Sequence, residues 1–124
     1  EMRNDLWLAM SRSPGEKKRL LLLMADKKIA EANSLIKSGK NKLALKAGRK
    51  ALDKLKYSKQ VAEATEKNNG LEERIFQAGY AYKMVLGAMK FEKGEKNDEY
   101  NKLIDELDRW NEEQREEKES REEQ

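Results

Sequence analysis

The fold is decided first by residues 13–39, SPGEKKRLLLLMADKKIAEANSLIKSG. Ser13, Pro14 and Glu16 mark a helix start, because serine caps the first amides, proline has the φ of a first helical residue and glutamate completes a capping box. Leucine, isoleucine and alanine then recur at spacings of three and four, which places them on one helix face. The glycine that closes the stretch favours the left-handed conformation that ends helices. The stretch therefore predicts a helix over residues 14–38.

The remainder of the chain predicts three more helices, over residues 41–68, 71–93 and 97 to as far as 124. Asparagine is a good helix cap, so Asn41 and Asn97 mark the starts of the first and last of these. The helices are separated by residues that favour turns, namely Gly39, Asn68, Asn69, Gly70 and Gly94. Because short connections make sequential helices neighbours, we expect an all-α, antiparallel bundle of about four helices.

Apolar residues of each predicted helix share one face, and a bundle buries that face. At the centre of the core we expect Ile29, Leu55, Tyr82 and Leu107. The second helix has a face of small residues that permits close approach of its neighbours. This face consists of Ala44, Ala47, Ala51, Leu55, Ser58 and Ala62. Gly79 and Gly87 share one face of the third helix, where either close packing or simple tolerance of glycine explains them.

The two ends of the chain are expected to differ from the bundle. The apolar residues around Trp7 predict a short N-terminal helix or an extended arm whose indole covers one end of the core. Residues 1–110 are predicted to form the single bundle domain, and residues 111–124 a charged tail that is either helical or disordered. Charges in the tail are spaced for i, i+4 ion pairs, such as Arg115 with Glu119.

The composition limits the chemistry that this chain can perform. Its 124 residues suit one domain, and they include no cysteine and no histidine. Disulfides and thiolate metal sites are therefore excluded, and the commonest general base and transition-metal ligand are missing. The carboxylates fall mostly on predicted outer faces beside lysine or arginine, where nothing raises their pKa. We therefore expect no catalytic residue, no cofactor and no metal site, and a protein that is not an enzyme.

Charge is distributed unevenly along the chain. Residues 1–60 contain 16 lysines and arginines against 6 acidic residues, whereas residues 61–124 contain 11 against 18. The second predicted helix is the most basic, and its candidate polyanion-binding residues are Lys42, Lys46, Arg49, Lys50, Lys54 and Lys56. Such a basic face binds the phosphates of a nucleic acid or another polyanion, docks against the acidic fourth helix, or is simply solvated.

The third predicted helix is the most apolar segment, and its large side chains do not all share one face. Tyr80 and Tyr82 point to different sides, and Phe76 and Met84 also lie off the main apolar stripe. Either the other helices bury these residues, or the third helix keeps an apolar strip available for a partner.

Residues 39–52, GKNKLALKAGRKAL, resemble the middle of a tetratricopeptide unit. The matching residues are Gly39, Ala44, Leu45, Lys50, Ala51 and Leu52. Asn41 and Gly48 stand where that family has aromatic residues, and the chain shows no second copy at the family's period of about 34 residues. The resemblance implies a helical hairpin of similar design.

Residues 7–55 also resemble a family of uncharacterised helical domains found in exported bacterial proteins. The matching residues are Pro14, Leu20 to Leu23, Ala30 to Ala32, Gly39 and Ala44 to Leu52. This resemblance implies an exported protein, whereas the residues themselves leave a cytoplasmic location open. The longest wholly apolar run, Leu20–Ala25, is far shorter than the roughly 20 residues that cross a bilayer, so we expect no transmembrane segment.

Together these observations predict a non-enzymatic helical module for protein–protein interaction or scaffolding. Its partner is then another protein that contacts an exposed face of the hairpin formed by the first two helices, or the charged last helix. The alternative function is phosphate-directed binding of nucleic acid or another polyanion through the basic second helix. A second copy of the chain is a further candidate partner, because the small-residue face and the stripe from Tyr100 to Trp110 are each suited to pairing with a copy.

Overall fold

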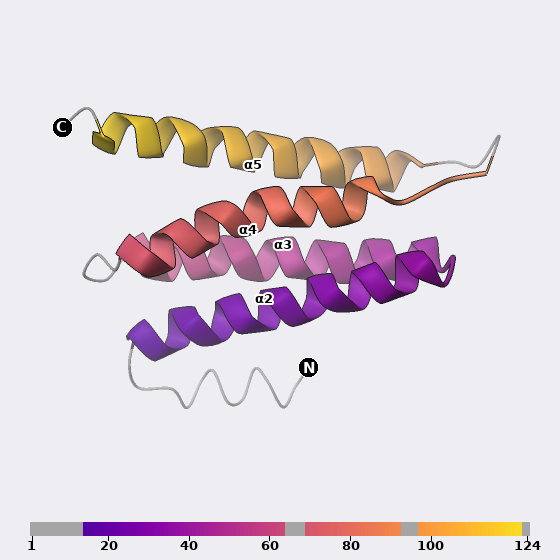
Figure 1. Cartoon of the computed structure of the whole chain (residues 1–124), viewed down its shortest axis with the longest axis horizontal. Helices are drawn as coiled ribbons and strands as arrows, with labels where there is room; N and C mark the ends of the chain where they lie inside the picture. Colours follow the sequence, from indigo (N-terminus) through magenta and orange to yellow (C-terminus); the bar gives the residue numbers. More distant parts are fainter. Residues whose placement is uncertain (1–13, 64–68, 93–96, 123–124) are drawn as a thin grey trace.

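A computed structural model describes residues 14–63, 69–92 and 97–122 of the chain. The helices in this part are α2, Pro14–Lys37; α3, Asn41–Glu63; α4, Asn69–Gly87; and α5, Asp98–Glu122 (Figure 1). Consecutive helices run in opposite directions, so the all-α, antiparallel bundle expected from the sequence is confirmed. The predicted N-terminal arm around Trp7 lies outside the described residues.

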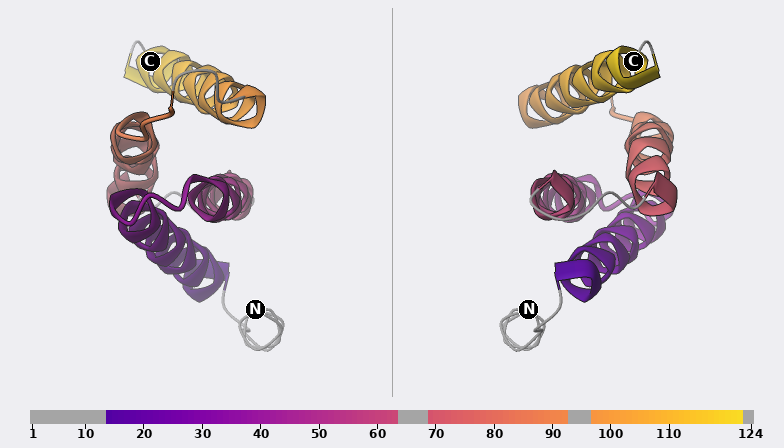
Figure 2. Two further views of the ribbon diagram at one scale, coloured as in Figure 1. Left: turned by 90° about the vertical axis from the view of Figure 1, so that its right-hand side faces the viewer. Right: turned by 90° about the vertical axis from the view of Figure 1, so that its left-hand side faces the viewer.

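Helices α3 and α4 form the centre of the bundle. They pack against each other, and each of them also packs against both α2 and α5. The end-on views show α2 and α5 on opposite sides of this central pair (Figure 2). The most extensive helix contact is the α2–α3 hairpin, which packs on α4 as the sequence predicts.

The core is centred on the residues expected from the sequence. Those four residues, Ile29, Leu55, Tyr82 and Leu107, are all buried. The small-residue face of α3 is buried at Ala44, Ala47, Ala51, Leu55 and Ser58. The Ser58 hydroxyl donates a hydrogen bond of 2.9 Å to the backbone carbonyl of Lys18. The polar atom on this face is therefore satisfied where α3 packs against α2.

Helix α2 is closed by a left-handed glycine, as the sequence predicts. Gly39 has a φ of +74°, a conformation that an L side chain adopts only with strain. The Gly39 amide donates to the Ile36 carbonyl at 3.0 Å, and the Lys40 amide donates to the Leu35 carbonyl at 2.9 Å. This pair of bonds is a Schellman motif, which satisfies two carbonyls at the helix end and directs the chain into α3.

The predicted boundaries of the third helix, 71–93, are wrong at both ends. Helix α4 begins at Asn69, so Asn69 and Gly70, which the sequence predicts as a turn, lie in its first turn. The first amides of a helix have no intrahelical partner, and asparagine and glycine are tolerated there for that reason. The predicted end of the second helix, residues 64–68, lies outside the described residues.

Helix α4 ends at Gly87, six residues before its predicted end. The amides of Ala88 and Met89 donate to carbonyls three residues back, which is the tighter turn that often closes a helix. Just beyond, the side-chain amide of Asn41 donates to the carbonyl of Lys90 at 2.8 Å. This bond ties the segment after α4 to the start of α3, and local periodicity does not reveal it.

Helix α5 continues without a break through the charged segment that follows Trp110. Asn111 is buried, and its side-chain amide donates to the carbonyl of Gly79 at 3.2 Å. The ion pairs of this segment include Lys59–Glu117 at 3.3 Å, Lys118–Glu73 at 3.1 Å and Arg115–Glu119 at 2.6 Å, and Arg115 also pairs with Glu112. The first two connect α5 to α3 and α4, so the segment packs on the bundle.

Two glycines allow the helices to approach closely. A Cβ added at Gly79 would lie 2.0 Å from Oδ1 of Asn111 and 2.8 Å from a ring carbon of Trp110, where α4 meets α5. A Cβ added at Gly48 would lie 2.7 Å from a leucine methyl of α4. Gly87, in contrast, has open space around the position of a Cβ. Close packing against α5 therefore explains the glycine at position 79. At position 87 nothing requires glycine, and the helix simply tolerates it.

We predict that Gly79→Ala destabilises the fold and that Gly87→Ala does not. Overpacking in a tight contact costs about 1–3 kcal/mol, which exceeds the gain in helix propensity of roughly 1 kcal/mol. Urea denaturation followed by circular dichroism should show a lower midpoint for Gly79→Ala and an equal or higher one for Gly87→Ala. Equal midpoints for the two variants would contradict the close contact between α4 and α5.

Candidate functional site

The six basic residues predicted to bind a polyanion do not form one open face. Lys42 and Lys46 are exposed, and neither makes an ion pair with any residue that the structure describes. Lys50 and Lys54 are half-buried and have interactions of their own. The remaining two residues of the set are paired with α5. The predicted surface is therefore divided between an exposed part and a part that stabilises the bundle.

The paired part is a clasp in which Arg49 and Lys56 both donate to Glu106 of α5. The Lys56 ammonium lies 2.7 Å from Oε1, and the Arg49 guanidinium donates to Oε2. The hydrogen bond from Lys56, followed by that from Arg49, lowers the pKa of the Glu106 carboxyl below its ordinary value of 4.5. Of the alternatives that the sequence left open, docking on acidic α5 therefore applies to Arg49 and Lys56, and exposure to solvent applies to Lys42 and Lys46.

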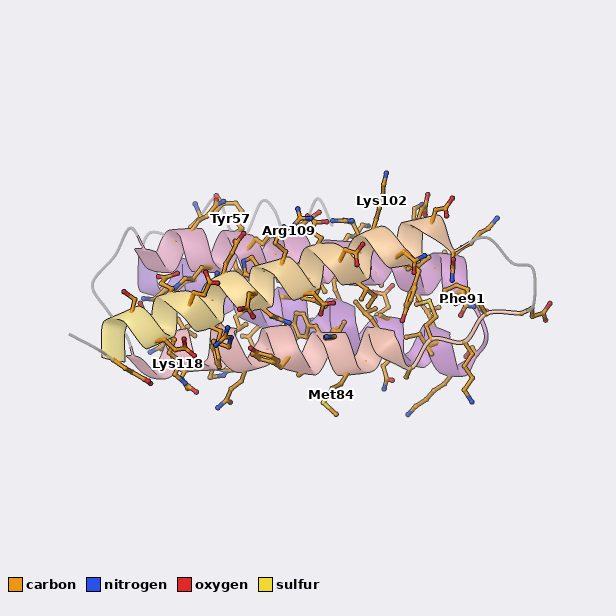
Figure 3. The ribbon with its side chains drawn as sticks, turned by 90° about the horizontal axis from the view of Figure 1, so that it is seen from above. Tyr57, Met84, Phe91, Lys102, Arg109 and Lys118 are labelled. Atoms are coloured by element: carbon orange, nitrogen blue, oxygen red, sulfur yellow. The ribbon has the colours of Figure 1, made fainter. Side chains whose placement is uncertain are left out.

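A groove runs beside this clasp, between α3 and α5. One hollow in it has a volume of about 490 Å³ and is lined by Arg49, Lys56, Lys102, Asp105, Glu106, Arg109, Trp110 and Glu113. A second hollow of about 340 Å³ shares Arg49 and Lys102 with the first and extends to Lys42 and Lys46. Figure 3, which looks onto α5, shows Lys102, Arg109 and Tyr57 along the same edge of the bundle. Helix α5 therefore contributes cations to the surface that the sequence assigned to α3 alone.

The charge of this groove is mixed. Its two hollows are also lined by the carboxylates of Glu99, Asp105, Glu106 and Glu113. Lys102 and Arg109 are exposed and make no ion pair within the described ranges. Sequence reasoning missed these two cations because it treated the fourth helix as acidic. Their seven-residue spacing, which places both on one helix face, is the signal that identifies them.

The outer face of α4 carries few charges after its first turns. Between Gln77 and Ala88 the only charged residue is Lys83, which pairs with Asp108 of α5. The exposed uncharged residues of this stretch, which we call the α4 strip, are Gln77, Tyr80, Ala81, Met84 and Gly87 of α4 and Ala88 just after it. The Met84 side chain is 79% exposed, and Tyr80 is 40% exposed. In Figure 3, Met84 projects from the edge of the bundle opposite Lys102 and Arg109. The sequence left open whether other helices bury Tyr80 and Met84. The other described helices do not bury them.

A second groove lies beside the α4 strip, between α4 and α2. Its middle part is a hollow of about 280 Å³ lined by Leu22, Asp26, Ile29, Arg74, Gln77, Ala78, Ala81, Tyr82 and Val85. Towards the α2–α3 turn lies a hollow of about 510 Å³ lined by Asn33, Ile36, Lys37, Gly39, Asn41, Ala88, Lys90 and Glu92. Both hollows lie along α2. The first is bordered by α4, and the second by the segment just after α4 and by Asn41 of α3. We call this succession of two hollows the α2–α4 groove.

One polar contact lies in the middle of the α2–α4 groove. The Tyr82 hydroxyl donates to Oδ1 of Asp26 at 2.5 Å, and the Arg74 guanidinium lies 3.7 Å from Oδ2 of the same carboxylate. Burial, followed by the hydrogen bond to Asp26, raises the pKa of Tyr82 above its ordinary value. The tyrosine thus remains a neutral donor, and the contact holds α2 and α4 together.

The described residues contain no cluster of three or more acidic side chains arranged to hold a metal ion. Hydrogen bonds from basic partners lower the pKa of Glu106 and of Glu112, whereas a general acid needs a raised one. Among the helices formed by the described residues, none has both the length and the apolar character of a bilayer-spanning segment.

Comparison with known proteins finds no matching family model, no matching characterised protein and no matching solved structure.

We predict that Glu106→Gln destabilises the bundle at neutral pH and loses that effect in acid. A lowered pKa in the folded state stabilises the fold above the ordinary pKa of 4.5, and the contribution disappears as pH falls through the lower, folded-state value. Because the carboxylate is 35% exposed, we expect a difference of only about 0.5–1 kcal/mol at pH 7. Urea denaturation of both proteins at pH 7 and at pH 3 measures this difference. A difference that stays the same at the two pH values would contradict the clasp.

Proposed function

We propose that this chain is a non-enzymatic helical module that binds another protein through the α4 strip and the groove beside it. The observation that carries the proposal is a run of exposed uncharged residues from Gln77 to Ala88, interrupted only by Lys83, which pairs with Asp108, in a chain whose residues are 41% charged. Apolar surface of this kind marks protein–protein contacts more often than chance exposure does. Depletion of charge at the centre of the contact is also typical of interfaces.

Other exposed apolar residues of the bundle lie beside charged residues. Leu23 of α2, for example, is 53% exposed but lies one turn from Arg19 on one side and one turn from Lys27 on the other. Scattered residues of that kind are normal on protein surfaces. The α4 strip also lies on a central helix that packs against all three others. A partner therefore meets a surface that is already formed, and binding requires little ordering of this chain.

We predict that a photo-crosslinking amino acid at position 84 captures a discrete partner in the cells that make the protein. The matched control is the same amino acid at Gln60, which is exposed on α3. The adduct should disappear when Ala81→Glu places a charge one turn away on the α4 strip, because an unpaired carboxylate is costly in an apolar contact. No adduct at position 84, or an adduct that Ala81→Glu leaves unchanged, would reject the proposal. An adduct of twice the chain's mass would identify a second copy as the partner.

A second candidate function, phosphate-directed binding of a polyanion, is supported by the α3–α5 groove. Four exposed cations line its hollows without an ion pair to any described residue, namely Lys42, Lys46, Lys102 and Arg109. The carboxylates in the same hollows weaken the attraction for phosphate. For this reason we rank polyanion binding below protein binding.

If the α3–α5 groove binds a polyanion, affinity for a random-sequence DNA duplex should fall steeply with salt. The slope of log K against log salt concentration is about −0.9 for each phosphate contacted. Lys46→Glu with Lys102→Glu should weaken binding and make the slope shallower. The control, Lys27→Glu with Lys90→Glu, changes net charge equally but lies outside this groove. Fluorescence anisotropy measures all three proteins, and no binding at low salt, or equal losses in the two variants, removes this function.

A further inference from the structure

The α2–α4 groove has the length and shape to accept one helix. The residues of α2 that line its two hollows run from Leu22 to Lys37. At a rise of 1.5 Å per residue this stretch is roughly 22 Å long, which corresponds to about four turns of a bound helix. On the α4 side the groove is bordered by Ala78, Ala81 and Ala88. Small residues of this kind let the backbone of a neighbouring helix approach closely.

The α4 strip extends the apolar surface beyond the groove. Ala81 and Ala88 belong to both the strip and the groove, and Met84 lies between them along α4. Methionine is flexible and adapts to the shape of an apolar partner. A helix seated in the groove would therefore contact Met84 with the same face that contacts the alanines, which requires an amphipathic helix.

The lysine end of the groove differs in charge from its middle. At the end near the α2–α3 turn, the lining residues include Lys37 and Lys90, which are exposed, and one carboxylate, Glu92. Neither lysine makes an ion pair with a residue in the described ranges. In the middle of the groove, Asp26 is already paired with Tyr82 and Arg74 and would repel a second carboxylate. Arg74 also lines this part, but the Asp26 carboxylate lies 3.7 Å from its guanidinium and opposes its charge. An acidic group of a partner is thus favoured most at the lysine end.

From this arrangement, and resting on the proposed function, we infer that the α2–α4 groove binds a single amphipathic helix of a partner protein. The apolar face of that helix lies on Ala81, Met84 and Ala88. Acidic residues at one of its ends lie beside Lys37 and Lys90. The alanines and the methionine provide the contact area, and the lysines fix the direction in which the helix lies.

The test is a selection of displayed peptides against the full chain. The library holds helical peptides of about 16 residues, with apolar positions randomised along one face and the end positions randomised between glutamate and lysine. Selected peptides should have apolar residues at i, i+3, i+4 and i+7, and glutamates at one end only. Binding of a selected synthetic peptide is then measured by fluorescence anisotropy.

Two pairs of substitutions separate the inference from the proposed function. Lys37→Gln with Lys90→Glu should weaken the selected peptide about tenfold, since about 1.4 kcal/mol is a factor of ten. A peptide whose glutamates are changed to lysine should regain affinity for this variant. The matched control, Lys42→Gln with Lys46→Glu on α3, should change affinity less than about twofold. Circular dichroism confirms that both variants are folded, as expected for exposed positions.

The outcomes are distinct. In one outcome, Ala81→Glu abolishes peptide binding but Lys37→Gln with Lys90→Glu has no effect. This result would overturn the inferred orientation of the helix, while protein binding by the α4 strip would still stand. Failure to select any peptide with an apolar helical face, or selection of peptides that ignore Ala81→Glu, would overturn both the inference and the proposed function. Loss of binding in the α3 control to the same extent would show a general charge effect, which also overturns the inference.

Discussion

The structure depends on the small-residue face of α3. Because Ala44, Ala47, Gly48 and Ala51 project little from the helix, α2, α4 and α5 all approach α3 closely. Larger side chains at these positions would force the neighbouring helices apart. The central position of α3 follows from this face, and so does the position of α4 beside it. The outer surface of α4 is then held in place by packing that lies underneath it.

Around this packed core, ion pairs connect neighbouring helices. Arg49 and Lys56 join α3 to Glu106 of α5, and Lys83 of α4 pairs with Asp108 at 2.6 Å. Other pairs that connect different helices are Lys59–Glu117, Lys118–Glu73 and Arg74–Asp26. Arg49, Lys56 and Lys59 of the basic first half therefore pair with carboxylates of the acidic second half. The uncharged α4 strip is conspicuous because it takes no part in these pairs.

The features that the sequence predicted are those that depend on local patterns. Helical periodicity identified the four buried centres of the core, and Gly39 marked the end of α2 through its left-handed backbone. The features that it did not predict depend on contacts between distant segments. The early end of α4 is accompanied by the bond from Asn41 to Lys90, and the two residues lie 49 positions apart. Periodicity contains no information about such a bond.

The same distinction applies to the candidate sites. The sequence identified the basic residues of α3 and an apolar strip on the third helix as alternatives, but it did not determine which residues face solvent. Arg49 and Lys56 became part of a clasp because Glu106 lies opposite them, whereas Lys102 and Arg109 joined the groove from α5. For all four residues, the surroundings of the side chain depend on how α3 packs against α5. That packing is tertiary structure, which local sequence patterns do not contain.

Binding by α4 requires that this helix is already folded and that tight packing around α3 holds it in place. Amide hydrogen exchange of the isolated chain, read residue by residue, measures this support. We predict the slowest exchange in the middle of α3, between Ala44 and Ser58, and strong protection from Ala78 to Leu86 of α4. Rapid exchange along α4 while α2 and α3 remain protected would contradict the account, because it would mean that the uncharged surface is not formed before a partner binds.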